Sequence, residues 1–208
     1  MEPISVSMVR ESFDGLPEYD LPSGYHFRTF KRGEGRIWAE VQTRAGNFPE
    51  IEKALEDFDK EFRDRQDEFE QRCLFLVDDQ SGEVIGATVA WLDPDFQGRD
   101  HGRIHWVAIV PEFQGRKLAK PMLCEAMRML RKWHPRVCLG THTSCRKAIS
   151  MYLDFGFVPD MTRERSEEAW PLIAEAIDHP ALDRFRSKGT CPNARFCDKC
   201  GNELTSTG

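Results

Sequence analysis

Apolar positions along this chain recur with two different spacings, which predicts a protein that mixes strands and helices. Short apolar runs bounded by turn residues predict strands at 24–30, 73–77, 84–91, 104–110 and 137–140. Apolar residues three or four apart predict amphipathic helices at 51–69, 118–133, 148–155 and 164–177. Up to residue 160 the expected order is strand, helix, three strands, helix, strand, helix, strand, with the last strand starting at Phe157.

The connections between these segments predict the type of sheet. Residues 78–82 form a short polar turn, so the strands on either side of it should pair as an antiparallel hairpin. A helix lies between the strands 104–110 and 137–140. Two strands joined in this way should be parallel, and the crossover connection between them should be right-handed. The sequence therefore predicts an α/β (α+β) fold with a mixed, mainly antiparallel sheet and one parallel step.

Composition divides the chain into four parts. Residues 1–22, rich in Pro, Gly and Glu, predict an irregular and loosely held leader, and residues 23–160 hold the predicted sheet. Residues 161–188 predict a helical extension, in which Pro171 either disturbs the helix or marks its start. Residues 189–208 form a short cysteine-rich tail.

Charge and cysteine content exclude several classes of protein. The formal net charge of -6 gives no basic footprint for binding phosphate backbones, so we expect no nucleic-acid partner. We find no long apolar run and no secretory signal, which predicts a cytoplasmic protein without a membrane span. Seven cysteines, an odd number without regular spacing, favour reduced thiols over a disulfide framework.

The most informative segment is the junction V-A-I-V-P-E-F-Q-G-R-K-L-A-K-P at 107–121, where an apolar strand leads through a basic turn into a helix. A helix that begins at a glycine-containing turn directs unpaired main-chain N–H groups and the positive end of its dipole at whatever lies above it. Pro121 suits the first helical turn, where its missing N–H costs no hydrogen bond. This junction predicts a phosphate-binding site.

The segment Gln114–Ala119 resembles the acetyl-CoA pyrophosphate loop of the GNAT N-acetyltransferase superfamily, whose pattern is Q/R-x-x-G-x-G/A. Lys117 stands where that pattern has its middle glycine. Its side chain either adds a phosphate contact or weakens cofactor binding. A second segment, A-I-S-M-Y-L-D-F-G-F at 148–157, resembles the family's A-I-x-x-Y-x-x-x-G-F signature, with Tyr152 on a helical face and Gly156 suited to a left-handed helix end. A core tyrosine is the plainer interpretation of Tyr152 alone.

The resemblance implies a GNAT fold over residues 23–160 and acetyl-CoA as cosubstrate. It also implies that an amine attacks the thioester directly in a ternary complex, with Tyr152 as the general acid and the N–H near Ile109 polarising the thioester carbonyl. The cofactor-binding residues it implies are Val107, Ile109, Val110, Gln114, Gly115, Arg116, Lys117, Leu118, Ala119 and Lys120.

The general base is less sharply indicated. His105 lies on the strand before the loop, and regular alternation would put its side chain on the same face as Val107 and Ile109. A histidine packed within the sheet is an equally good interpretation. The neighbouring groups Asp93, Asp100 and His101 are further candidates.

Three cysteines in the tail, Cys191, Cys197 and Cys200, resemble a contracted zinc knuckle. A closed zinc site needs four ligands, and the fourth would be His179, Cys138 or His134. A degenerate knuckle or reduced surface thiols are the alternatives.

The acceptor, a small-molecule or peptide amine, is not identified by any motif, and the oligomeric state is undetermined. The loops expected around the acceptor are 31–47, 93–102 and the segment after residue 160. Within them Arg36, Trp38 and Glu40 either line the pocket or pack as an amphipathic segment. The rival function is a non-catalytic acyl-CoA-binding or protein-interaction module on the same scaffold.

Overall fold

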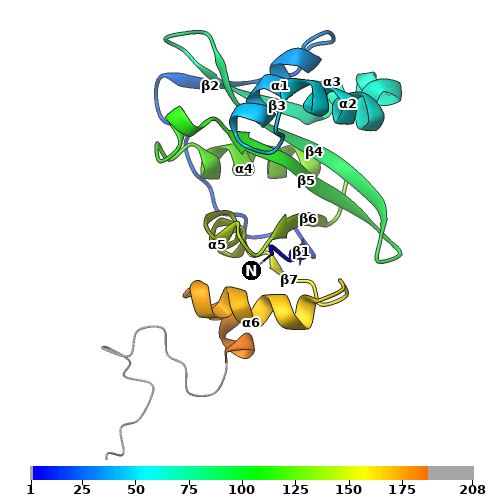
Figure 1. Ribbon diagram of the computed structural model, residues 1–208, viewed down its shortest axis with the longest axis vertical. Helices are drawn as coiled ribbons and strands as arrows, with labels where there is room; N and C mark the ends of the chain where they lie inside the picture. The colour runs from blue at the N-terminus through cyan, green and yellow to red at the C-terminus, as the bar shows by residue number, and fades with distance from the viewer. Residues whose placement is uncertain (1, 187–208) are drawn as a thin grey trace, which may run out of the picture.

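A seven-stranded sheet runs through the protein in the order β2-β3-β4-β5-β6-β1-β7, as seen in a computed structural model that describes residues 2–186 (Figure 1). The strands are β1 (Ser5–Arg10), β2 (Tyr25–Thr29), β3 (Cys73–Asp78), β4 (Val84–Phe96), β5 (Arg99–Ile109), β6 (Val137–His142) and β7 (Val158–Pro159). The α-helices are α1 (Gly35–Arg44), α2 (Ile51–Phe62), α3 (Gln66–Arg72), α4 (Ala119–Leu130), α5 (Arg146–Asp154) and α6 (Ser166–Ala176).

The pairing of the strands confirms the predicted fold class. β5 and β6 pair in parallel, whereas every other pair of neighbouring strands is antiparallel. The parallel pairing runs only from Gly102 and Val137 to Ile104 and Leu139. β5 continues to Ile109 and β6 continues to His142, but no residues beyond Ile104 and Leu139 pair between them. The two strands therefore diverge.

Helices cover both faces of the sheet. Figure 1 shows α1, α2 and α3 on one side of β4 and β5, and α4 on the other. On the first side, the Phe30 ring lies against the rings of Phe58, Phe69 and Phe75 of β3, at centroid distances of 4.8 to 5.9 Å. On the second side, the predicted stripe of α4 is buried at Leu118, Met122, Ala126 and Leu130. Trp133, the fifth member of that stripe, is 40% exposed because the helix ends at Leu130, and the Arg72 guanidinium covers it at 4.3 Å.

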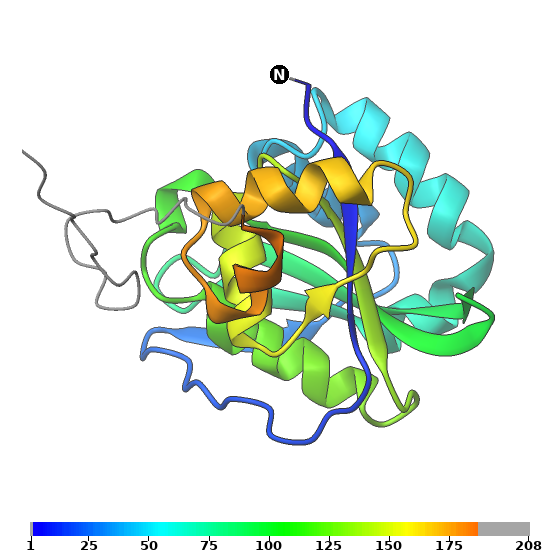
Figure 2. The same ribbon diagram turned by 90° about the horizontal axis from the view of Figure 1, so that it is seen from below.

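The predicted irregular leader is wrong for residues 5–10, which form β1. This strand pairs with β6 along its whole length and with β7 at Met8 and Val9. Figure 2 shows it passing between those two strands. The physical reason is burial of Ile4, Val6 and Met8 in the core, while the buried Ser7 hydroxyl between them donates to Asp160 Oδ2 at 2.6 Å.

The predicted helix 51–69 is interrupted. α2 ends at Phe62, a 3₁₀ turn spans Arg63–Arg65, and α3 follows. The turn brings Phe62 and Phe69 to a centroid distance of 4.3 Å, with both rings buried against Trp91. Burial of both aromatic rings therefore replaces a straight helix with two short ones.

Two expected loops are regular structure. Residues 35–44, within the predicted acceptor loop, form α1, and most of 93–102 extends β4 and β5 into a long hairpin that turns at Gln97 and Gly98.

Pro171 lies inside α6 rather than at its start, and Gly156 adopts the expected left-handed conformation with φ +75°. Within residues 2–186, none of the helices has the length and apolar character needed to cross a membrane.

Candidate active site

The turn before α4 holds main-chain donors without intramolecular partners. Gly115 and Lys117 have φ of +78° and +62°, and Leu118 precedes the first residue of the helix. The N–H groups of Gly115, Lys117 and Leu118 make no hydrogen bond to other residues in the range 2–186, and the N-cap side chain supplies none. A Cβ atom built on Gly115 would meet nothing within 4 Å, so the turn is open on that side. Such a turn offers several unpaired donors to an anion.

Side chains of the turn brace it against the rest of the protein. Gln114 Nε2 donates to the Ile109 carbonyl at 2.9 Å, which ties the turn to the end of β5. The Arg116 guanidinium donates to the Glu112 carbonyl at 3.0 Å and to the Tyr25 hydroxyl at 3.2 Å. These contacts hold the main chain in the conformation that exposes its donors.

Other residues predicted to bind the cofactor have structural contacts. Lys120 Nζ lies 3.0 Å from Asp154 Oδ2 and so links α4 to the end of α5; this pairing raises the pKa of Lys120. The Val110 N–H donates to the Ile85 carbonyl at 2.9 Å, and the Leu118 side chain is buried in the core. The main-chain N–H of Val110 and the side chain of Leu118 are therefore not available to a ligand.

A bulge in β5 changes the direction in which His105 points. The pairing with β4 moves from Ala87–Ala108 to Val89–His105, so β5 has one residue more than β4 in this stretch, and Trp106 has φ +51°. His105 and Trp106 therefore both face the α1–α2 side, while Val107 and Ile109 face the other side. The expectation that His105 shares a face with Val107 and Ile109 is wrong, because it assumed regular alternation.

Glu61, in the last turn of α2, meets both of these side chains. Its Oε1 lies 2.9 Å from His105 Nε2, and its Oε2 accepts from Trp106 Nε1 at 3.0 Å. Burial alone would raise the pKa of Glu61, but hydrogen bonds from His105 and Trp106 outweigh it, so the pKa is lowered. Burial lowers the pKa of His105, and Glu61 opposes this only in part. His105 is therefore a neutral imidazole at neutral pH.

Nothing in the sequence singled out Glu61. It lies in a run of acidic and basic residues that reads as the solvated face of a helix, 44 residues from His105. Only the end of α2, fixed by the turn at Arg63–Arg65, places its carboxylate against β5.

Residues of α1 contact the bulge in β5 and hold its main chain in place. Gln42, fully buried, donates from Nε2 to the Trp106 carbonyl at 2.9 Å and accepts from Asn47 Nδ2 at 2.6 Å. Trp38 is also fully buried, at 5.6 Å from the Trp106 ring. The packing interpretation of the segment 36–40 thus holds for Trp38, and Arg36 and Glu40 form an ion pair of 3.0 Å on the surface.

Tyr152 lies on the buried face of α5, at 5.9 Å from the Phe157 ring. Burial raises the pKa of its hydroxyl, so the phenol stays protonated over the whole physiological range. The hydroxyl makes no hydrogen bond within residues 2–186. The phenol therefore keeps its proton at neutral pH, and that proton has no acceptor within residues 2–186.

Two of the further base candidates, Asp100 and His101, have partners of their own. Asp100 pairs with His134 Nδ1 at 3.1 Å. His101 is fully buried and contacts the Arg99 carbonyl through Nδ1 at 3.0 Å. Asp93 lies opposite His101 in the hairpin.

The predicted zinc ligands Cys191, Cys197 and Cys200 lie outside the described residues. Within the described part, no group of three His, Cys, Asp or Glu side chains could hold a metal ion. The residues considered as a fourth ligand have contacts of their own. His179 Nδ1 accepts from the Ala181 N–H at 3.1 Å, and Cys138 is buried in β6, which raises the pKa of its thiol to about 12.

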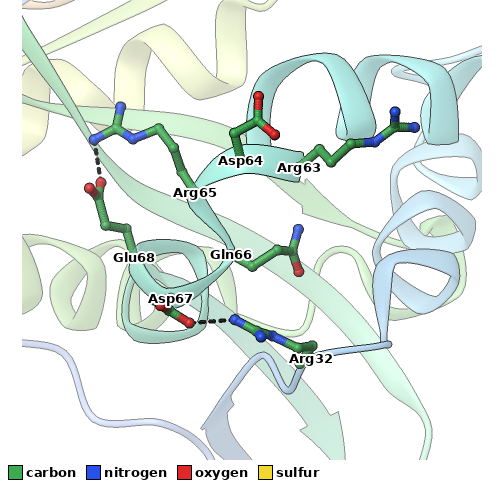
Figure 3. Close-up of a pocket in the computed structure, with 7 residues that line it drawn as sticks. All are labelled: Arg32, Arg63, Asp64, Arg65, Gln66, Asp67 and Glu68. Carbon is green, nitrogen blue, oxygen red and sulfur yellow. Dashed lines mark hydrogen bonds and ion pairs between the residues drawn. The ribbon is translucent and has the colours of Figure 1, made fainter.

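A polar depression of about 380 Å³ lies at the junction of α2 and α3, lined by Arg32, Arg63, Asp64, Arg65, Gln66, Asp67 and Glu68 (Figure 3). Its charges are matched internally, since Arg65 pairs with Glu68 and Arg32 with Asp67. The residues singled out from the sequence are not among those that line it.

Comparison with known proteins agrees with this architecture. A family model described as "Acetyltransferase (GNAT) family" matches residues 30–157. Two curated relatives are named mycothiol acetyltransferase. The one from Paenarthrobacter aurescens is 26% identical, and the match covers 71% of this chain and 46% of the relative. The one from Saccharomonospora viridis is 30% identical, and the match covers 68% of this chain and 48% of the relative. The chain thus spans about half the length of these relatives.

A solved GCN5-related N-acetyltransferase from Sphaerobacter thermophilus is similar in fold, with a TM-score of 0.62 at 21% identity, over 76% of this chain and 50% of that one. The family match covers the diverging strands, the turn before α4 and the helix that carries Tyr152. This chain therefore belongs to the GNAT acetyltransferase family.

Proposed function

We propose that the chain transfers an acetyl group from acetyl-CoA to a primary amine by direct attack in a ternary complex. Family membership supports acetyl transfer, and the open turn before α4 supports a diphosphate-bearing donor. The observation that carries the proposal is the set of unpaired N–H groups at Gly115, Lys117 and Leu118, next to the divergence of β5 from β6. The amine acceptor is proposed from the family's chemistry, because the curated relatives match this chain over only about half their length and do not define its acceptor.

The residues present fit acetyl-CoA. The donors at 115–118 suit the pyrophosphate, and the basic side chains of Arg116 and Lys117 are exposed beside them. The free edge of β5 at Val107–Ile109 offers main-chain groups to an extended pantetheine arm, in the way that an added strand pairs with a sheet edge.

The chemistry needs a base, a polarised carbonyl and an acid. His105, neutral and held by Glu61, accepts a proton from the incoming ammonium. The amine lone pair forms the C–N bond as the C–S bond breaks, with the N–H near Ile109 stabilising charge on the carbonyl oxygen. Tyr152 donates its proton to the departing thiolate, and the proton released by the new amide returns to the tyrosine through solvent.

Thiol release from acetyl-CoA, measured across a panel of primary amines, tests the proposal. We expect turnover with at least one amine class. The Tyr152→Phe variant should lower kcat by about 10²- to 10⁴-fold, the usual contribution of a positioned acid. Its affinity for acetyl-CoA and its unfolding temperature should not change, because the hydroxyl makes no hydrogen bond within residues 2–186. Unchanged turnover in this variant would remove Tyr152 as the acid.

One observation favours a non-catalytic acyl-CoA-binding module instead. Lys117 occupies a left-handed conformation, at the position where the family pattern has glycine. Calorimetric binding of acetyl-CoA without thiol release on any amine would support this rival.

We further propose that the catalytic domain begins before residue 23. β1 lies between β6 and β7, so a domain limited to 23–160 would lose the strand that joins β7 to the rest of the sheet. The extension after residue 160 also packs on this domain, since Trp170 of α6 is fully buried and donates to the Asp160 carbonyl at 3.3 Å.

A further inference from the structure

The contact between Glu61 and His105 determines which ring nitrogen carries the proton. An ionised carboxylate only accepts hydrogen bonds, so the ring nitrogen that faces it must be an N–H. His105 Nε2 is that nitrogen, at 2.9 Å from Oε1 and 3.2 Å from Oε2. In a neutral imidazole, a proton on Nε2 leaves a lone pair on Nδ1.

Trp106 strengthens this assignment. The indole Nε1–H can only donate, and it occupies Glu61 Oε2 at 3.0 Å. With a second donor on the same carboxylate, Glu61 is held in its ionised form and cannot offer a proton to the imidazole. His105 Nδ1 makes no hydrogen bond to any residue of the described range 2–186, so its lone pair is available.

The location of His105 matches this role. It lies one residue after the last pairing of β5 with β6 at Ile104, and two residues before the free edge that begins at Val107. The side chain is 15% exposed, which leaves a path to an acceptor while excluding most water. The bulge that turns it toward α2 is itself held by the Gln42 amide.

We propose that Glu61 is a positioning residue that fixes His105 as the Nε2–H tautomer and so presents Nδ1 as the base for the acceptor amine. This inference rests on the proposed acetyltransferase function. The proton passes from the acceptor ammonium to Nδ1 and leaves a neutral amine, whose lone pair forms the new C–N bond as the C–S bond breaks.

The charges around His105 give this role a pH signature. Glu61 on α2, Arg103 on β5 and Asp93 on β4 act on the imidazole; Arg103 lowers its pKa, and the two carboxylates raise it. Loss of the Glu61 charge therefore lowers the pKa of His105 further. The acid limb of the kcat/KM profile should move to lower pH when Glu61 is neutralised.

The first test is the Glu61→Gln variant, which keeps the shape but offers one acceptor and one donor. Because Trp106 requires the acceptor oxygen, the amide NH₂ faces Nε2 and favours the opposite tautomer. We expect kcat/KM for the amine to fall about 10- to 100-fold, part of what a general base contributes. The KM for acetyl-CoA should not change. The matched control is Glu52→Gln, an exposed position on the same helix, which should behave as the unaltered protein.

The second test measures the tautomer without relying on activity. Long-range ¹H–¹⁵N spectra of protein labelled with ¹⁵N-histidine distinguish a protonated ring nitrogen from a bare one, and His105→Gln assigns the signal. We expect protonated Nε2 and bare Nδ1 in the unaltered protein, and a shift toward the other form in Glu61→Gln.

Two results would overturn the proposal. One is a proton on Nδ1 in the unaltered protein, which is measurable however well the variant folds. The other is a Glu61→Gln variant with the rate and pH profile of Glu52→Gln. A protein that acetylates no amine, yet shows the expected tautomer, would instead refute the proposed function, and the base role with it, while the Glu61–His105 contact would stand.

Discussion

Lys117 and Gly115 both adopt left-handed backbone angles in the turn before α4, but only glycine does so without steric cost. An L-residue in this region costs roughly 1 to 2 kcal/mol, which explains why the family pattern has glycine where this chain has lysine. The turn retains its shape nevertheless, because Gln114 and Arg116 brace it. The strain at Lys117 is therefore compatible with the conformation that exposes the main-chain donors.

Gly115 allows a matched test of the turn. Gly115→Glu should lower the affinity for acetyl-CoA by at least about tenfold, since it places a negative charge beside the donors intended for phosphate. The control is Gly98→Glu at the tip of the β4–β5 hairpin, where φ is +70° and a Cβ also meets nothing within 4 Å. Both variants carry the same backbone strain. Equal calorimetric affinities for the two would show that the cofactor binds elsewhere.

The direction of His105 could not be predicted from its sequence position. Alternation assigns every second residue of a strand to one face, and one extra residue reverses the assignment beyond it. The bulge depends on Gln42 and on aromatic packing from α1, both distant in sequence from β5.

At the scale of elements, β1 shows how a weak local pattern becomes decisive. Residues 5–10 hold three apolar residues in a short segment of a stretch rich in proline, glycine and glutamate, yet Val6 and Met8 are fully buried. β1 is held in the sheet by pairing with β6 along one edge and with β7 at Met8 and Val9 on the other, and neither partner is close in sequence.

Met8→Ala tests whether β1 belongs to the folded core. Removing this fully buried side chain should lower the free energy of unfolding by about 2 to 5 kcal/mol, the range for cavities left in a core. Ser5→Ala, at an exposed position of the same strand, should change it by less than about 0.5 kcal/mol. Denaturant unfolding measures both. Similar small losses in the two variants would favour a loosely held leader.

The break between α2 and α3 is a second element that local periodicity did not reveal. The apolar stripe continues through the break, so a single helix is the natural expectation from 51–69. The packing of Phe62 and Phe69 against Trp91 favours two helices, and this break fixes where Glu61 lies relative to β5.

At the scale of the whole molecule, the pair Glu61–His105 links protonation to stability. The pKa of His105 is lowered from 6.5 in the folded protein, so the unfolded chain binds this proton more readily. The contribution of the His105 pKa shift to the free energy of unfolding is therefore fully present above about pH 6.5, the ordinary histidine pKa. It is lost as the pH falls toward the lower pKa that His105 has in the folded protein. The lowered pKa of Glu61 acts in the same direction in a separate window below its ordinary value of 4.5.

We therefore expect the unfolding temperature to fall as the pH is lowered from about 7.5 to about 5, which spans the ordinary histidine pKa of about 6.5. The His105→Gln variant should lose less stability over the same interval, because it lacks this proton-binding site. Thermal unfolding at constant ionic strength measures the difference. A steeper loss in the variant would contradict the direction assigned to the pKa of His105.

The sequence alone determined the family and most of the sheet. Three features are short local patterns whose backbone conformation follows from their own residues: the turn at 114–119, the helix with Tyr152 and the glycine at 156. They can therefore be recognised from the sequence without knowledge of the fold. Tertiary structure alone decided the place of β1, the break after α2, the bulge at Trp106 and the carboxylate that holds His105. Each of these depends on contacts between segments far apart in the chain, and no local propensity encodes the free energy of such contacts.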